Sequence, residues 1–121
     1  MGKSFQRFFR YGSAAKSLME FDVSFNDFSG TLDLEHLPDA LVRLALHKNR
    51  FSGSIVLKSL PKIMKSLLVA HNELSGTLDL TELPPAMDLL SLKKNSFTGL
   101  TDFSRLPATL RILDVSHTSL S

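Results

Sequence analysis

The side chains of this 121-residue chain that are best suited to chemistry are histidines and lysines at or next to repeated positions. His71 and His117 lie two periods of 23 residues apart, and His47 is one position out of that register. Imidazole rings that a fold brings together can bind a metal ion or transfer protons. What these rings can do therefore depends on where a 23-residue period places them.

A five-residue motif that starts with asparagine defines this period. Asn-Asp-Phe-Ser-Gly occupies residues 26–30, and variants of it return at 49–53, 72–76 and 95–99. Two apolar residues separated by one position precede each motif, and a fifth pair begins a copy in which Thr118 replaces the asparagine. The pairs are Phe21 and Val23, Leu44 and Leu46, Leu67 and Val69, Leu90 and Leu92, and Leu113 and Val115. A fixed period with this pattern predicts stacked repeats, each buried against its neighbours.

Each repeat is expected to begin with a short strand and a turn. The apolar alternation has a period of two residues, which predicts a strand with those side chains buried. Strands one repeat apart must be parallel, and the asparagine after each can bond backbone groups left unpaired at the turn. The glycine of the motif predicts a positive φ or a close approach between repeats. A core column is predicted from Phe28, Phe51, Leu74, Phe97 and Leu120.

A second strand and a tight turn are expected to complete each repeat. Alternating segments at 32–34, 55–57 and 78–80 predict this second strand, and the fourth copy departs from the pattern. A Leu-Pro pair follows in four copies, first at residues 37–38. Because proline favours extended geometry in the preceding residue, the pair predicts a turn or a short 3₁₀ segment rather than a long helix.

Residues 41–51 read Leu-x-x-Leu-x-Leu-x-x-Asn-x-Phe, and this pattern resembles the leucine-rich repeat family. The resemblance covers residues 18–121. The Asn-x-Phe-Ser-Gly-Thr-Leu-Asp-Leu and Leu-Pro motifs are also similar to leucine-rich repeat proteins of protozoan parasites. The resemblance implies a curved, right-handed solenoid with a parallel β-sheet on its concave face and short second strands and turns or 3₁₀ segments on its convex side. It also implies protein binding on the concave face.

The first 17 residues differ from the rest, with four basic residues and no acid. Shifting them by one period aligns Phe5 with Phe28, which predicts an atypical N-terminal cap or degenerate repeat over residues 1–17. The alternative is a basic amphipathic helix for a membrane surface or for organelle import. The 23-residue repeats then occupy residues 18–121, and the last one is incomplete.

Composition and charge exclude several classes of function. The net charge of +2 gives only a weak attraction for nucleic acid. The chain has no cysteine, which excludes disulfides and thiolate metal sites and favours a reducing compartment. No apolar run is long enough to span a bilayer, and Arg7 and Arg10 interrupt any apolar core of a signal peptide. We therefore expect a cytoplasmic location.

The residues between the buried pairs are expected to face outward, where several of them are apolar. Leu68, Leu89 and Ile112 are large and apolar, and Ala45 and Ala70 extend them into a diagonal patch. An exposed apolar patch with a positively charged rim predicts a protein partner that is acidic around an apolar anchor. The predicted partner-binding residues are Arg43, His47, Lys48, Leu68, His71, Leu89, Lys93, Lys94 and Ile112.

The same spacing argues against metal, cofactor and catalytic sites. Parallel strands lie about 4.8 Å apart, so His71 and His117 would be separated by roughly 9–10 Å. Lys48 and Lys94 would flank His71 and repel a cation. No Ser-His-Asp group or carboxylate pair is aligned, so we predict no enzyme. Nucleic-acid binding is disfavoured because Phe25 is the only aromatic residue on the predicted face.

The predicted function is a non-enzymatic module that binds a protein partner on its concave sheet face. The alternative is a structural or truncated repeat segment that self-associates through uncapped terminal coils, because unpaired strand edges invite pairing with another chain. The first prediction places the sensitive residues in the middle of the sheet, and the second places them within residues 112–121.

Overall fold

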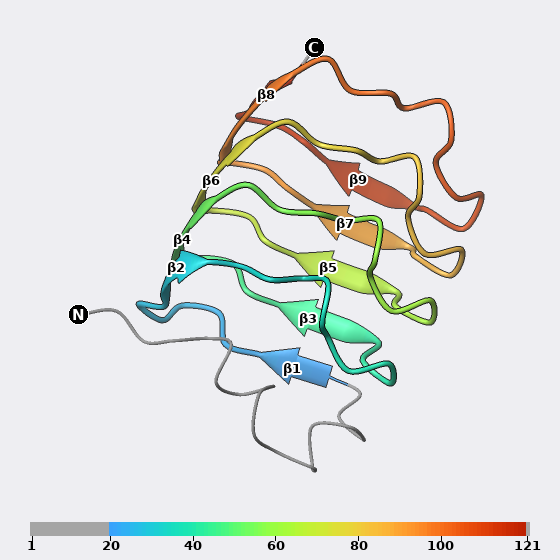
Figure 1. The fold of residues 1–121 in the computed structure, drawn as a ribbon, viewed down its shortest axis with the longest axis horizontal. Coiled ribbons are helices and arrows are strands. Elements are labelled where there is room, and N and C mark those ends of the chain that lie inside the picture. The colour runs from blue at the N-terminus through green and yellow to red at the C-terminus, as the bar shows by residue number, and fades with distance from the viewer. Residues whose placement is uncertain (1–19, 121) are drawn as a thin grey trace.

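The computed structural model describes residues 20–120, which form a β-solenoid of about four turns without any helix in that range. Each coil contributes one strand to each of two five-stranded parallel sheets (Figure 1). The first sheet contains β1 (Glu20–Asp22), β3 (Arg43–Ala45), β5 (Ser66–Leu68), β7 (Leu89–Ser91) and β9 (Ile112–Asp114). The second contains β2 (Ser29–Thr31), β4 (Arg50–Gly53), β6 (Glu73–Gly76), β8 (Ser96–Gly99) and β10 (Ser119–Leu120). The predicted cap at residues 1–17 lies outside the described residues.

The strands of the first sheet pair in one register from coil to coil. Phe21 is opposite Leu44, and Leu44 is opposite Leu67. The same register aligns Leu90 with Leu113 further along the sheet. A slip of one residue would turn this buried column out to solvent. The constant 23-residue period thus fixes the register, and the predicted first strands are confirmed.

The second sheet lies earlier in each repeat than the sequence predicts. Its strands run through the Ser-Gly segment of the motif, whereas the alternating segment at 32–34 and its equivalents in later coils are not strands. The alternation there reflects burial alone, because Leu32 and Leu34 are both in the core. Between them, Asp33 Oδ1 accepts a hydrogen bond from the backbone N–H of Glu35 at 2.9 Å. This bond forms a local turn in place of a strand ladder.

The predicted core column runs through the centre of the solenoid. Phe51, Leu74 and Phe97 are fully buried. The rings of Phe28 and Phe51 are parallel to within 3°, with centroids 6.2 Å apart. Leu120 packs against the core from a partly buried position. The column is therefore structural, since truncating a buried phenylalanine costs about 3–5 kcal/mol.

The turn between the first and second strand of each coil, here called the asparagine corner, is bonded to its neighbour by a side chain. Asn49 Oδ1 accepts a hydrogen bond from the backbone N–H of Phe28 at 3.1 Å, and its Nδ2 donates to the carbonyl of Val23 at 3.0 Å. Both partners lie in the preceding coil. Asn72 and Asn95 make the equivalent bonds in later coils. The predicted asparagine ladder is confirmed.

The Leu-Pro turn at the opposite end of each coil, here called the proline corner, is closed by the backbone. The carbonyl of Pro38 accepts a hydrogen bond from the N–H of Leu41 at 3.0 Å, and three later coils repeat this bond. Neighbouring coils are joined here by backbone bonds, such as that from the N–H of Lys65 to the carbonyl of Val42 at 2.8 Å. Of the two predicted alternatives, residues 20–120 contain the turn and no 3₁₀ segment.

Candidate functional site

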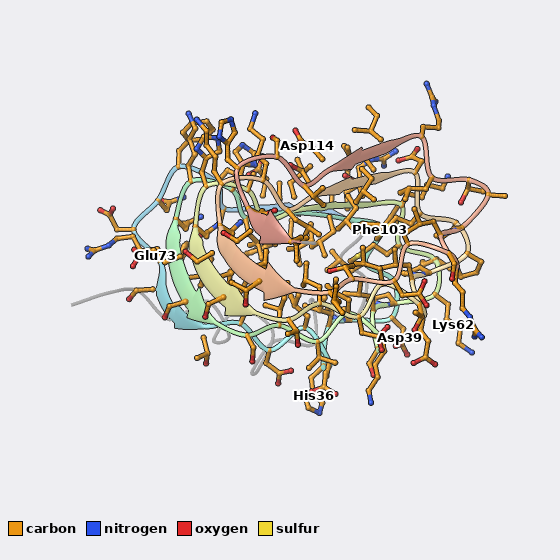
Figure 2. The ribbon with its side chains drawn as sticks, turned by 90° about the horizontal axis from the view of Figure 1, so that it is seen from above. His36, Asp39, Lys62, Glu73, Phe103 and Asp114 are labelled. Carbon is orange, nitrogen blue, oxygen red and sulfur yellow. The ribbon has the colours of Figure 1, made fainter. Side chains whose placement is uncertain are left out.

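The predicted partner-binding residues lie on the outer face of the first sheet and on the turns that follow it. Along β3, Leu44 is buried while Arg43 on one side is exposed and Ala45 on the other is half-buried. Viewed along the solenoid, Asp114 of this sheet and His36 lie on opposite sides of the molecule (Figure 2). The first sheet therefore presents its own outer surface, separate from the side that carries His36.

Three large apolar side chains lie on three adjacent strands of this face and are here called the apolar strip: Leu68, Leu89 and Ile112. Leu89 is directly opposite Ile112 on the next strand. Leu68 lies diagonally from Leu89, because Leu89 pairs with Ser66 at the other end of β5. Ile112 is 55% exposed, and the two leucines are half-buried. The strip is therefore accessible across three adjacent strands.

One member of the predicted apolar patch is misplaced. Ala70 is only 6% exposed and belongs to the interior. It follows β5 at the point where the chain bends into the asparagine corner, so the strand alternation no longer decides which side chains face out. Ala45 remains partly accessible and pairs with Leu68. Arg43 is directed to Glu20 of the preceding strand, with Nη1 3.3 Å from Oε1. Both of these side chains are exposed, so the ion pair contributes little to stability.

The turn after each strand of the first sheet has an unusual backbone. One residue per coil adopts a left-handed conformation with φ between 55° and 60°, although none of these residues is glycine. The five residues are Phe25, Lys48, His71, Lys94 and His117. This conformation costs roughly 1–2 kcal/mol for a residue with a Cβ atom. The sequence pattern did not predict it, because this position carries no glycine or asparagine in any copy.

Five basic side chains gather on three successive turns and are here called the basic cluster: His47, Lys48, His71, Lys93 and Lys94. Lys48 and Lys94 are exposed, and the other three are half-buried. Partial burial lowers the pKa of His71, and the positive charges of its neighbours lower it further. In decreasing order of effect, these neighbours are Lys94, Lys48, Lys93 and His47. His71 is therefore held in its neutral form at pH 7.

An exposed aromatic ring borders the basic cluster. Phe25 is 68% exposed, and its ring meets that of His47 edge to face with centroids 5.1 Å apart. The Nζ of Lys48 lies 4.9 Å from the centroid of the Phe25 ring, within the range of a cation–π contact. His47 also contacts Ser24, because its Nδ1 is 2.9 Å from the hydroxyl of that residue. These contacts orient His47 and Lys48 at one end of the cluster.

Two aspartates lie at the ends of the first sheet. The backbone N–H of Ser24 and then its hydroxyl lower the pKa of Asp22. The hydroxyl of Ser116, 2.7 Å from Oδ1, and then its backbone N–H lower the pKa of Asp114. Both carboxylates stay ionised at neutral pH. The outer face is thus positive along the central coils and negative at each end.

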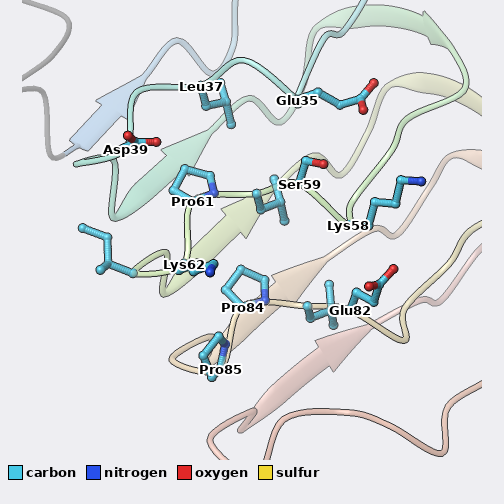
Figure 3. Close-up of a pocket in the computed structure, with 13 residues that line it drawn as sticks. Glu35, Leu37, Asp39, Lys58, Ser59, Pro61, Lys62, Glu82, Pro84 and Pro85 are labelled. Atoms are coloured by element: carbon cyan, nitrogen blue, oxygen red, sulfur yellow. The ribbon is translucent and has the colours of Figure 1, made fainter.

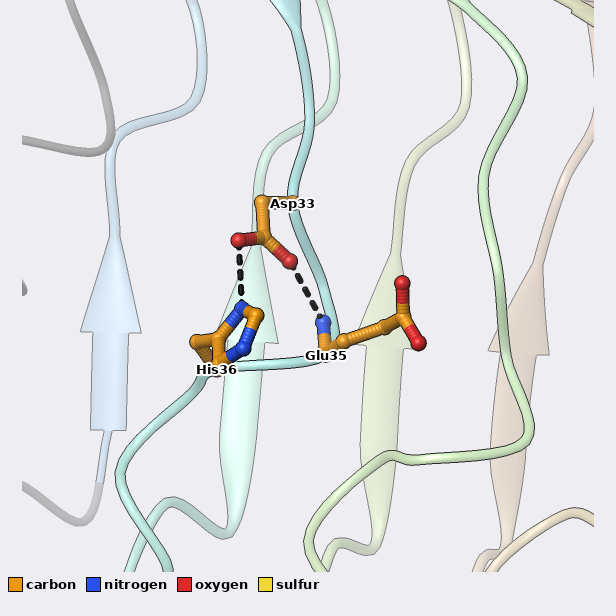
Figure 4. A network of polar contacts seen from close by, with 3 residues as sticks. All are labelled: Asp33, Glu35 and His36. Carbon is orange, nitrogen blue, oxygen red and sulfur yellow. Dashed lines mark hydrogen bonds and ion pairs between the residues drawn. The ribbon is translucent and has the colours of Figure 1, made fainter.

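No group of three or more histidine, aspartate or glutamate side chains within residues 20–120 is placed to hold a metal ion. The fourth histidine, His36, is on the opposite side of the molecule. Its Nδ1 lies 2.6 Å from Oδ2 of Asp33, and the same carboxylate accepts the N–H of Glu35 (Figure 4). The bond to Asp33 raises the pKa of His36. This pair is a surface contact that caps a turn.

A groove of about 940 Å³ runs along the proline corner. Figure 3 shows the side chains that line it, including stacked prolines from two successive coils. Its charged residues have mixed sign: Glu35, Asp39, Lys58, Lys62 and Glu82. The sequence analysis missed this groove, because it forms only when the Leu-Pro turns of three coils are stacked.

Comparisons of the chain with protein-family profiles, curated proteins and solved structures gave no significant match. The class defined by the geometry is a parallel β-solenoid with a 23-residue coil. The part of the chain that the structure describes contains no helix that is long and apolar enough to cross a membrane.

Proposed function

We propose that the protein is a leucine-rich repeat solenoid that acts as a non-enzymatic interaction module and binds a protein partner on the outer face of its first sheet. The observation that carries this proposal is the apolar strip, in which Leu68, Leu89 and Ile112 adjoin across three strands and Ile112 is 55% exposed. Apolar surface at the centre of a polar rim is typical of protein interfaces. The agreement of the repeat pattern with parallel stacking supports the proposed family.

The arrangement of charge supports a partner that is acidic around an apolar anchor. The basic cluster lies on the turns that follow β3, β5 and β7, and the last two of these strands carry Leu68 and Leu89. Exposed positive side chains attract acidic surfaces at long range. The mixed charges of the proline-corner groove offer no such selection between acidic and basic partners. We therefore assign the interface to the first sheet.

The test compares the wild-type chain with a Leu68→Asp/Leu89→Asp variant as bait for capture from cells that produce the protein. The control is Ile63→Asp/Leu100→Asp, which adds the same two charges at exposed apolar positions away from the strip. Circular dichroism verifies that all three chains fold. We expect wild type and control to retain a partner that the strip variant loses. Direct titration of that purified partner should show that the strip variant binds it more weakly than the other two chains. Equal binding by all three would contradict the proposal.

The alternative function, self-association through a terminal coil, has one observation in its favour. Core positions of the last coil are only partly buried, whereas the equivalent positions one coil earlier are fully buried, as for Leu113 compared with Leu90. Sedimentation over a range of concentrations tests this alternative. A monomer at every concentration would exclude it, and a dimer abolished by Leu113→Asp would favour it over the first proposal.

A further inference from the structure

The basic cluster is built around one imidazole ring. His71 lies in the middle coil of three, with Lys48 in the coil before and Lys94 in the coil after. The backbone N–H of His71 donates to the carbonyl of Lys93 at 3.0 Å, and the N–H of Lys48 makes the equivalent bond to the middle coil. With coils about 4.8 Å apart, the backbones of Lys48 and Lys94 are roughly 10 Å apart. Flexible lysine side chains can both reach an anion placed over His71.

The positive charge of the cluster has little compensation from neighbouring acids. The neighbours whose charge lowers the pKa of His71 are three lysines and the ring of His47, and none of them is an acid. Asp114 interacts with Lys93, but its carboxylate already accepts two hydrogen bonds from Ser116. The ion pairs found within residues 20–120 join Arg43 to Glu20, Arg50 to Glu73 and His36 to Asp33. The lysines of the cluster therefore form no ion pair within residues 20–120, and Lys48 can exchange its contact with the Phe25 ring for an outside anion.

The cluster also continues the apolar strip along one coil. His71 follows Leu68 by three residues, which spans at most roughly 10 Å at the rise of an extended strand. A segment of protein can bridge this distance with an apolar side chain at one end and a carboxylate at the other. The strip and cluster together fit such a segment better than a nucleic acid, because the exposed phenylalanines within residues 20–120 are Phe25 and Phe103, and of these Phe25 is the one that contacts the cluster.

Taking the proposed function as its basis, we propose that the protein partner presents a carboxylate about 10 Å from its apolar anchor, and that this carboxylate binds over His71 between Lys48 and Lys94. At a pH between the pKa values of His71 in the free protein and in the complex, its ring takes up a proton from solvent when the complex forms, while the carboxylate stays ionised. Burial, three lysines and the ring of His47 disfavour the imidazolium in the free protein, and a bound anion opposes them.

The direction of the pH dependence follows from this coupling. In the free protein the pKa of His71 is lowered by its burial, by Lys94, Lys48 and Lys93, and by His47. A bound carboxylate raises the pKa of His71 in the complex above its value in the free protein. The added affinity is fully present below the free pKa and is lost as pH rises through the pKa of the complex. Binding should therefore be stronger at pH 5.5 than at pH 7.5.

The experiment uses nuclear magnetic resonance titration of the full chain with two synthetic peptides. One is acetyl-Ser-Leu-Ser-Ser-Asp-Asp-Ser-amide, and the other carries asparagine in place of both aspartates. We expect the acidic peptide to shift the signals of Leu68 and His71, to raise the pKa of the His71 ring, and to bind at least about threefold more tightly at pH 5.5. Because Lys48→Gln/Lys94→Gln removes two exposed charge contacts with the peptide, it should weaken binding about tenfold.

Matched variants and competing anions decide the outcome. Lys58→Gln/Lys62→Gln removes the same charge at the proline corner and should leave binding unchanged, and His71→Gln should abolish the pH dependence. No shift at His71, equal binding of both peptides, or preferential binding of oligothymidylate or phosphatidylserine vesicles would overturn the inference. If partner capture still depends on Leu68 and Leu89 in that case, the proposed function stands and only the carboxylate site is lost.

Discussion

The asparagine corner and the proline corner occupy opposite ends of every coil, and they are stabilised by different groups. At the asparagine corner a buried amide bonds both to its own coil and to the coil before it, as Asn95 does with Leu92 and Leu74. At the proline corner the turn closes on itself through a backbone bond, such as that between Pro61 and Met64. Stability should therefore depend on side-chain identity at the first corner far more than at the second.

The largest expected effect comes from removing one amide of the ladder. Asn72→Ala removes the oxygen that accepts the N–H of Phe51, whereas the carbonyls of Leu46 and Val69 keep their bonds from the neighbouring ladder amides. We expect a loss of about 3 kcal/mol, because an unsatisfied buried N–H costs about 1–3 kcal/mol and the three hydrogen bonds of the amide nitrogen are lost with it. Chemical denaturation measures the loss, with Glu82→Ala at an exposed site as the control. Equal stability of the two variants would show that the two corners do not differ as described.

A pair of glycine variants separates backbone strain from contact between coils. Gly99 and Gly30 both have a positive φ, of 92° and 87°. A Cβ at Gly99 would lie 3.0 Å from Cγ2 of Thr77, whereas at Gly30 it would meet no described atom within 4 Å. We expect Gly30→Ala to cost about 1–2 kcal/mol from strain alone and Gly99→Ala about 1 kcal/mol more.

The methyl group of Thr77 provides the check on that difference. In a double-mutant cycle, Thr77→Ser should recover most of the additional loss in Gly99→Ala, because it removes Cγ2 and keeps the hydroxyl. If Thr77→Ser has the same effect with glycine or alanine at position 99, the contact between coils does not explain the difference.

A smaller effect is expected at the proline corner. Pro38→Ala keeps the carbonyl that accepts the N–H of Leu41, so the turn can still close. The variant mainly gains conformational freedom in the unfolded chain, which lowers stability by about 0.4–1 kcal/mol. Thermal unfolding of this variant beside Asn72→Ala measures the contrast between the corners. If Pro38→Ala lowered stability as much as Asn72→Ala does, the two corners would not differ as described.

The smallest effect concerns acid, at the aspartate turns that lead into the proline corner. The hydroxyl of Ser104 and then its backbone N–H lower the pKa of Asp102. A carboxylate with a lowered folded pKa stabilises the fold above its unfolded value of about 3.9, and this stabilisation is lost as pH falls through the folded pKa. Asp102→Asn keeps an oxygen acceptor that does not titrate. Between pH 5 and pH 2.5 the variant should lose less stability than wild type, as measured by urea denaturation.

The sequence predicted the features of the fold that depend on the period. The constant 23-residue spacing was sufficient to predict the parallel first sheet, the asparagine ladder and the core column that includes Phe51 and Phe97. The second sheet was misplaced because alternation reports burial, and Leu32 and Leu34 are buried without being in a strand. Distinguishing a strand from a buried turn requires the hydrogen-bond partners of the backbone. Here the side chain of Asp33 is one of those partners, because it accepts the N–H of Glu35.

The candidate site was predicted less completely. The outward positions of Leu68, Leu89 and Ile112 follow from strand alternation, which the sequence contains. Beyond the strand ends alternation no longer applies, so the burial of Ala70 and the left-handed backbone of His71 were not predictable from it. Whether these residues bind a partner remains a prediction for the experiments above.

The asparagine ladder also sets an order in time for the assembly of the solenoid. The N–H of Phe28 is bonded by Asn49, which is 21 residues later in the chain, and the carbonyl of Val23 gains the same side chain, 26 residues later, as a second donor beside Asn26. A ribosome adds about 5–20 residues per second, so each coil emerges roughly 1–5 seconds before the amide that secures it. The growing chain therefore always ends in one unsecured coil, and its newest strand edge is open to a neighbouring nascent chain until the next asparagine is made.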